Sequence, residues 1–518
     1  MGQDLSNSTP TEKKINGKTS PGRPAGEPRT PSRALIFLPF SVLILVFSAC
    51  SGLSGMDAAV TPTSTRTASA TPTLQPTITP AATGLVEVYW YIGLGTGAQP
   101  AQIPLEKAFI DKYNNTQGAA DGIRLIADIH MGHNYARDDV LDMIHDGNAL
   151  DIIGPVGTEG RGWIEEHILD LQPLIDQSNY DLSDFDPAFL KFYKTENGLV
   201  GLPFAIFPSA LYYNKDLFDQ AGLAYPPHRV GEKYSLDGEA LEWNFDTVAK
   251  VARRMTLDSN GVSADQPGFD PQKIVQYGFD FQWTKDSVRW FSAYFEPYYP
   301  VKDGKADLSP GQIAAIKWYY DGMWGGQPFI PNQAAMDSDL IEGNSFNSGK
   351  VAMGLTHLWY TCCVDGGEEA AVKRWDVGVV PSYNGKTTAK MHADTFSIMK
   401  SSKNPEAAFK VYSYMVGEGA PELFAIYGGL PARKSQQPDF FDLLKEKYVP
   451  NEIDWQVFQD MISYLEVPGH ELALPNIAKA HDGFLRLGSD LRTKPSLNID
   501  AVIAQFLVDQ TAIYNEAP

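Results

Sequence analysis

The sequence predicts an α/β fold built from alternating strands and helices. Two observations predict it. The chain has 518 residues, of which 43% are hydrophobic, which is enough for more than one hydrophobic core. From Leu85 to Ile153, short apolar stretches rich in β-branched residues alternate with stretches of helical periodicity. This alternation favours parallel sheets covered by helices.

The first elements follow in a clear order. Leu85 to Ile92 (LVEVYWYI) is typical of a buried strand, and Leu105 to Tyr113 has helical spacing. Ile123 to Ile129 predicts a second strand, Val140 to Ile144 a helix, and Asp151 begins a third strand. Ligands of such sheets bind at the carboxyl ends of the strands, which here are residues 90–97 and 154–161.

The N-terminal region is typical of an export signal. Residues 1–33 are polar and basic, and the apolar run from Ala34 to Ala49 is shorter than the ~20 residues that span a bilayer. Phe47-Ser48-Ala49-Cys50 resembles a lipoprotein cleavage box. We expect a signal peptide at 1–49, lipidation of Cys50 and a Thr/Ser/Pro linker at 50–83, with an uncleaved signal anchor as the alternative.

Charge and motif content exclude several classes of function. The chain has 42 Lys+Arg against 63 Asp+Glu, a formal charge of -21, which argues against a nucleic-acid partner. His130-Met131-Gly132-His133 lacks the further ligands of a zinc set, and Asp258, Asn260 and Asp265 lack the spacing of a calcium loop. We therefore predict neither a metal nor a cofactor. The adjacent residues Cys362 and Cys363 could be two free thiols or could form a vicinal disulfide, and the sequence leaves both alternatives open.

Five segments together resemble the family 1 extracellular solute-binding proteins of bacterial ABC importers, the group that contains the maltodextrin-binding proteins. In chain order, these segments are the strand and helix at 88–114, the Asp151-Ile152-Ile153 strand, GLVGLPFAIFPSALYYNKDLFDQAGL (198–223), FNSGKVAMGLTHLWYT (346–361) and HADTFSIMKSSKNPEAAFKVYSYM (392–415), which YGGLPARKS (427–435) follows.

The resemblance implies a two-lobed periplasmic-binding-protein-like α/β fold. Each lobe would be a mainly parallel sheet flanked by helices, and three crossings near 203–209, 390–394 and 466–474 would form the hinge. The expected lobes are 84–204 plus 392–466 and 205–391 plus 467–518. The implied protein is a monomer on the outer face of the cytoplasmic membrane that delivers a mono- or oligosaccharide to ABC permease subunits and is not an enzyme.

The resemblance also indicates where the solute binds. Sugar sites combine aromatic rings, which stack on pyranose faces, with planar polar groups that bind hydroxyls. Residues of both kinds lie at the expected rims and crossings, with Trp290 as a further candidate: Trp90, Tyr91, Glu159, Arg161, Phe207, Ser209, Trp283, His357, Trp359, Tyr360, His392, Asp394 and Arg433.

Two departures from the maltodextrin pattern leave the solute open. Gly154 to Glu159 replaces the Trp and Asp that follow the corresponding strand in that group, and Phe207 stands where that group has a Glu. The same fold could carry a peptide, a polyamine or a phosphorylated polyol, with Arg161 and Arg433 serving an anion. An exported glycosidase is the other alternative, and Glu159 and Asp394 are its candidate carboxylates.

Overall fold

The computed structural model describes residues 84–516 except 95, 99, 101, 131–135, 149, 365–369 and 450. The predicted signal peptide, Cys50 and the linker therefore lie outside the described residues, as do His133 and the side chain of Cys362.

One ten-stranded sheet runs through the molecule. Its strands follow in the order β2 (Ile123–Ile129), β1 (Val86–Ile92), β3 (Ile152–Gly157), β15 (Met391–Ile398), β6 (Leu202–Asn214), β13 (Val351–His357), β10 (Ile274–Asp280) and β9 (Leu257–Asp258), and β14 (Trp375–Gly378) and β16 (Leu430–Pro431) also pair with β6. The pairs β1–β2, β1–β3 and β10–β13 are parallel. Pairs that involve β6 or β15 are antiparallel.

Strand β6 connects the two ends of this sheet. All of its residues are buried, as expected for an apolar run that is covered on both faces. Residues 202–208 pair with β15 and β16, whereas residues 209–214 pair with β13 and β14. The strand thus divides the sheet into a first half (β1, β2, β3, β15, β16) and a second half (β9, β10, β13, β14).

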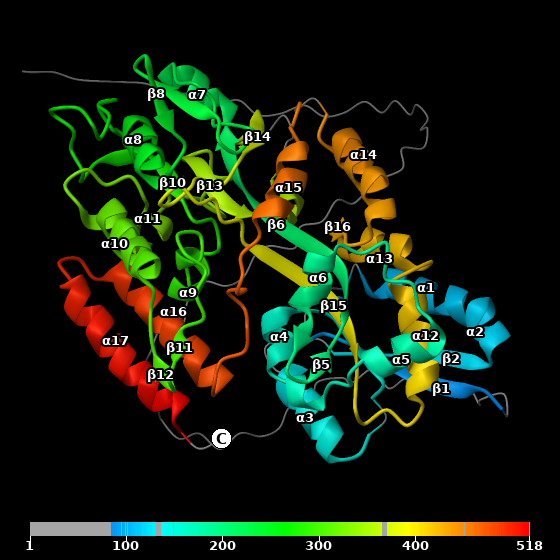
Figure 1. Ribbon diagram of the computed structural model, residues 1–518. Helices are drawn as coiled ribbons and strands as arrows, with labels where there is room; N and C mark the ends of the chain where they lie inside the picture. The colour runs from blue at the N-terminus through cyan, green and yellow to red at the C-terminus, as the bar shows by residue number, and fades with distance from the viewer. Residues whose placement is uncertain are drawn as a thin grey trace, which may run out of the picture. The chain divides into compact units, whose positions relative to one another are not determined.

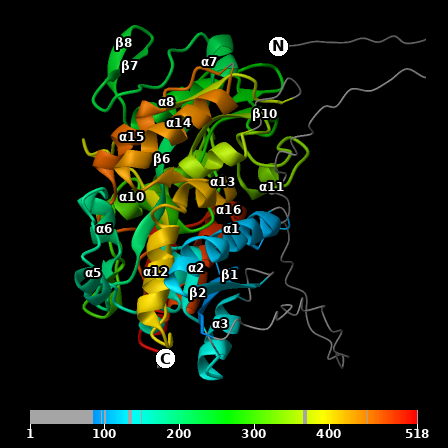
Figure 2. The same ribbon diagram turned by 90° about the vertical axis from the view of Figure 1, so that its right-hand side faces the viewer.

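Helices cover both halves (Figures 1 and 2). In the first half, α1 (Ile103–Asn115) packs on β2, and α12 (Pro405–Met415) packs on β15 and β1. The other first-half helices are α2 (Gln117–Asp121), α3 (Ala136–His145), α4 (Thr158–Gly162), η1 (Glu165–His167), α5 (Gln172–Ser178), α6 (Pro187–Phe192), α13 (Ala420–Tyr427) and η3 (Lys434–Gln436), with the hairpin of β4 (Lys194–Thr195) and β5 (Gly198–Leu199).

In the second half, α8 (Phe245–Met255) packs on β10 and β13, and α16 (Ile477–Thr493) packs on α9 (Val288–Ser292) and α17 (Ile499–Tyr514). The remaining elements are α7 (Lys215–Ala221), α10 (Pro310–Trp324), α11 (Gln333–Met336), η2 (Leu358–Cys362), and the hairpins β7 (Lys233–Leu236) with β8 (Glu239–Glu242) and β11 (Val301–Lys302) with β12 (Lys305–Ala306).

The structure confirms the predicted fold class and the order of the first elements. The predicted strands and helices between residues 85 and 153 are β1, α1, β2, α3 and β3. Asn214 caps α7 by accepting hydrogen bonds from the N–H groups of Asp216 and Leu217. Asn404 stands at the N-cap position of α12, but its side chain makes no capping hydrogen bond there.

The chain returns to the second half before residue 466. After α14 (Gln437–Lys447), the Tyr448 and Trp455 rings lie 5.4 and 6.2 Å from that of Trp375 in β14. Next come α15 (Gln456–Met461) and η4 (Ile462–Tyr464), and residues 465–474 then run along the boundary between the halves. We therefore propose that the first lobe consists of residues 84–204 and 392–447. The second lobe then consists of residues 205–391 and 448–518.

Among the described residues, none of the helices is both long enough and apolar enough to cross a membrane.

Close packing of α8 on β10 requires a glycine at position 278. A Cβ at Gly278 would lie 2.0 Å from the Ala252 carbonyl oxygen in α8, so the helix would have to move. We expect Gly278→Ala to lower the free energy of unfolding by roughly 1–3 kcal/mol. Gly326→Ala is the matched control, because a Cβ there meets nothing within 4 Å. Equal stability of the two variants in denaturant unfolding would contradict this packing.

Candidate functional site

A cavity of ≈ 260 Å³ lies between the two halves of the protein. Residues after the carboxyl ends of β1 and β3 form one side of it, as expected for an α/β sheet. The second half contributes α9, α16 and the segment 465–474. The lining residues are Leu94, Val156, Gly157, Glu159, Gly160, Trp163, Trp290, Glu471 and His481.

Two tryptophans and two carboxylates give this cavity its chemistry. Trp163 and Trp290 come from opposite halves, as do Glu159 and Glu471. The Glu159 carboxylate forms an ion pair with His481 Nδ1 of α16, and this contact bridges the halves. Indole faces beside carboxylates suit a ligand that has both apolar faces and hydroxyl donors.

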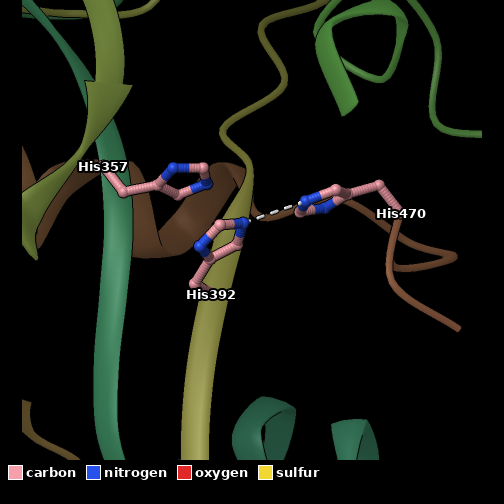
Figure 3. A group of neighbouring side chains, drawn as sticks. All are labelled: His357, His392 and His470. Atoms are coloured by element: carbon pink, nitrogen blue, oxygen red, sulfur yellow. Dashed lines mark hydrogen bonds between the residues drawn. The ribbon is translucent and has the colours of Figure 1, made fainter. Parts of the chain in front are cut away.

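Three histidines meet where the connecting segments converge (Figure 3). His357 ends β13 and pairs with Ser209 of β6, His392 of β15 pairs with Phe207, and His470 belongs to the segment 465–474. One ring nitrogen from each of the three histidines lies within 4.8 Å of the other two.

Hydrogen bonds define the protonation of two of these imidazoles. The Trp359 indole N–H donates to His392 Nδ1 at 3.0 Å, so the His392 proton resides on Nε2. His392 Nε2 lies 3.2 Å from His470 Nε2. His470 Nδ1 donates to the Glu466 carboxylate, which also accepts the N–H groups of Met391 and His470 at 3.2 and 3.0 Å. A continuous chain therefore runs from Trp359 to Glu466.

An aromatic cluster lies beside the histidines. The Trp283 and Trp359 rings stack at 5.4 Å, and Tyr360 packs edge-on against Trp283 at 5.2 Å. Trp283 has φ 59°, a conformation that is rare for a bulky residue and is often found at functional sites.

Burial dominates the electrostatics of this region. It raises the pKa of Asp394 to about 7 and of Glu466 to about 8, the latter against the opposing charge of Lys390. Burial and then the neighbouring Glu159, Glu466 and Asp394 raise the pKa of Glu471. Burial also lowers the pKa of the buried Lys390 to about 7 and lowers the pKa of His357, His392 and His470.

Of the thirteen residues predicted for the site, one lines the cavity and the others lie elsewhere among the described residues. Glu159 lines the cavity, and Asp394 pairs with Gly157 on the cavity wall. Two of the predicted residues, His357 and His392, belong to the histidine cluster. Five more lie beside this cluster: Phe207, Ser209, Trp283, Trp359 and Tyr360.

The structure uses four of the predicted residues elsewhere. Trp90 and Tyr91 are fully buried in the first half, where Trp90 packs on Phe396 and Tyr91 stacks on His130. The Arg161 guanidinium is buried against Glu165, at 3.1 Å. Arg433 donates to the Val416 carbonyl and lies over Phe185, and its contacts are therefore structural.

Four residues of this region are absent from the sequence-based prediction: Trp163, His470, Glu471 and His481. Trp163 lies two residues beyond Arg161, the last residue of the predicted rim. A rim extended by one helical turn would have included it. His470 and Glu471 lie inside the crossing predicted at 466–474. That prediction could therefore have indicated them as site residues. Helix α16, which carries His481, has no sequence feature that directs it to the cavity.

Comparison with known proteins identifies the family. Residues 157–420, about half of the chain, match the model of the bacterial extracellular solute-binding protein. Binding proteins of Brucella abortus and Brucella suis are 27% identical over 289 residues, 54% of this chain and 60% of theirs. The chain thus spans 60% of the length of these curated relatives.

Solved structures agree on the fold. UspC of M. tuberculosis has a TM-score of 0.62 at 17% identity, covering 83% of this chain and all (100%) of UspC. The substrate-binding protein Lmo0181 of Listeria monocytogenes, solved with cycloalternan, has a TM-score of 0.61 at 18% identity. The match covers 83% of this chain and 98% of Lmo0181. Maltose-bound MalE3 of T. maritima has a TM-score of 0.56 at 15% identity, and the match covers 82% of this chain and 99% of MalE3. The mixed sheet, the helices on both halves and the family match converge: this chain belongs to the bacterial extracellular solute-binding protein family.

Proposed function

We propose that this protein captures a carbohydrate in the cavity between its halves and delivers it to an ABC import permease. The observation that carries the proposal is the cavity itself, where Trp163 and Trp290 from opposite halves accompany Glu159 and Glu471. Similar structures solved with cycloalternan or maltose support a carbohydrate as the solute. A peptide, a polyamine or a phosphorylated polyol is the alternative class of cargo.

Closure follows from the placement of these groups. A solute held by both halves at once stabilises the closed form, because the open form cannot make both sets of contacts. Indole rings on the two sides can each cover one face of a sugar ring, and the carboxylates can accept its hydroxyl hydrogens.

We further propose that the protein is a monomeric lipoprotein. Lipidation of Cys50 would hold it at the outer face of the cytoplasmic membrane, and the Thr/Ser/Pro segment 50–83 would act as a tether. The sequence pattern Phe47-Ser48-Ala49-Cys50 supports this part of the proposal.

A hydrolase is the second candidate function. The raised pKa of Asp394, about 7, is a property that suits a general acid. We nevertheless propose binding without turnover, in keeping with the family. Incubation with the bound saccharide followed by chromatography decides between the two: recovery of intact saccharide supports a carrier, and cleavage products would establish an enzyme.

Trp290 should contribute strongly to affinity for the solute. We expect Trp290→Ala to weaken binding of the best saccharide in a calorimetric screen by about 10- to 100-fold, since a stacked indole at the centre of a site contributes roughly 1.4–2.8 kcal/mol. Trp324→Ala is the matched control, because Trp324 does not line the cavity. Its indole N–H donates a hydrogen bond to the Leu491 carbonyl oxygen at 2.8 Å. Equal affinity of both variants would remove Trp290 from the site.

The bridge between Glu159 and His481 should favour the closed form without solute. We expect Glu159→Gln to shift the equilibrium towards the open form by up to about fivefold, because a partly exposed ion pair contributes roughly 0–1 kcal/mol. Small-angle scattering of the solute-free protein should show a larger radius of gyration. Lys479→Ala is the control, since Lys479 pairs with Glu516 within the second half. An unchanged radius in Glu159→Gln would contradict the role of the bridge.

A further inference from the structure

Three imidazoles from distant parts of the chain converge at the boundary between the halves (Figure 3). His357 lies opposite the crossing strand β6, His392 lies on β15, and His470 lies in the segment 465–474. Imidazole is a preferred ligand of Zn²⁺ and related divalent cations.

His357 is the first indication of a ligand other than protein. Its side chain is fully buried, and neither ring nitrogen has a hydrogen-bond partner among the described residues. A buried polar group without a partner costs roughly 1–3 kcal/mol, so such groups indicate a further binding partner. Figure 3 shows one of these nitrogens on the side of the other two imidazoles. The ring stacks on that of His392, with 3.7 Å between the ring centroids, and it would have to turn for its nitrogen to face a shared ligand.

The spacing of the other two imidazoles suits a shared cation. His392 Nε2 and His470 Nε2 are 3.2 Å apart. Two nitrogens bound to a tetrahedral Zn²⁺ are about 3.3 Å apart when each bond is 2.0–2.1 Å long. The distance between these two nitrogens thus already matches that of a shared cation, and both rings would turn so that their lone pairs meet at it.

Carboxylates occupy the positions that metal sites use. Glu466 accepts the Nδ1 hydrogen of His470 and so directs the Nε2 lone pair at His392, which is the usual carboxylate–histidine arrangement around a bound metal. Glu471 Oε1 lies 3.5 Å from His392 Nε2, and its buried Oε2 has no hydrogen-bond partner among the described residues. Glu471 can thus supply a fourth ligand.

The local charge also favours a cation. Glu471 interacts with Glu159, Glu466 and Asp394, which makes four carboxyl groups. The basic groups that face the histidines are Lys390 and Arg289. A divalent cation would stabilise the ionised form of these buried carboxyl groups.

We propose that His357, His392 and His470 bind one divalent transition-metal cation of the Zn²⁺ type, with Glu471 as fourth ligand and Glu466 as the residue that orients His470. Such a cation joins β13, β15 and the segment 465–474 at the boundary between the halves. The three histidines are separate from the sugar contacts of Trp163 and Trp290, whereas Glu471 also lines the cavity and is shared by the two sites.

A cation at this position changes the surroundings of Trp359. A cation bound at His392 Nε2 requires the His392 proton to move to Nδ1, where it displaces the Trp359 indole N–H. Trp359 must then change its environment beside Trp283. Metal occupancy is therefore expected to alter tryptophan fluorescence.

Titration of the chelator-treated full chain with Zn²⁺ alone tests the site. Calorimetry should show one Zn²⁺ per chain, and Co²⁺ should give the visible absorption of a tetrahedral site. We expect His392→Gln and His357→Gln each to lower Zn²⁺ affinity by at least about 100-fold and Glu466→Gln by about 10- to 100-fold. His145→Gln is the control, since the His145 side chain is 88% exposed.

Each variant is first checked for folding by circular dichroism without metal. His392→Gln carries the test if the more buried His357→Gln does not fold, because the His392 side chain is 26% exposed. Binding of Zn²⁺ with unchanged affinity in His392→Gln, or no binding by the natural protein, would overturn the proposal.

Trp359→Phe separates a metal site from a merely structural cluster. The Zn²⁺-dependent change in fluorescence should disappear in this variant, while Zn²⁺ affinity is kept or increased because no indole competes for His392. Loss of Zn²⁺ binding in Trp359→Phe would contradict the proposed rearrangement.

Discussion

The structure depends on the pairing of β6 with different partners at its two ends. Leu202–Asn214 is buried along its whole length, and its partners change from β15 and β16 to β13 and β14 at Ser209. One continuous strand thus fixes the position where the halves meet. The histidine cluster is built around that position, because His357 pairs with Ser209 and His392 pairs with Phe207. The cavity lies beside the cluster, and Glu471 lines the cavity and approaches His392.

The groups at this boundary are buried, polar and close together. Isolated buried charges are costly, so their presence needs compensation from partners or ligands. Some compensation is visible, as in the contacts of Glu466 with His470 and with the Met391 N–H. His357 and the Oε2 atom of Glu471 lack it within the described residues, which is why a solute and a cation together account for the region better than packing alone.

The fold and part of the site could be predicted from the sequence. Local patterns define β1, α1 and β2, and the crossing expected near 203–209 falls within β6, the strand that pairs with both halves of the sheet. Patterns cannot say whether an aromatic residue faces a cavity or a core, since Trp90 and Trp163 both lie near the expected rim. The histidine cluster was missed because His392 and His470 are 78 residues apart, far outside any local ligand spacing.

A crystal structure of the protein with its best-binding saccharide tests the central claim most directly. We expect a sugar ring in the cavity that contacts Trp163 or Glu159 of the first half and Trp290 of the second half at the same time. A saccharide bound to the surface of one half, with the cavity left without it, would contradict the account.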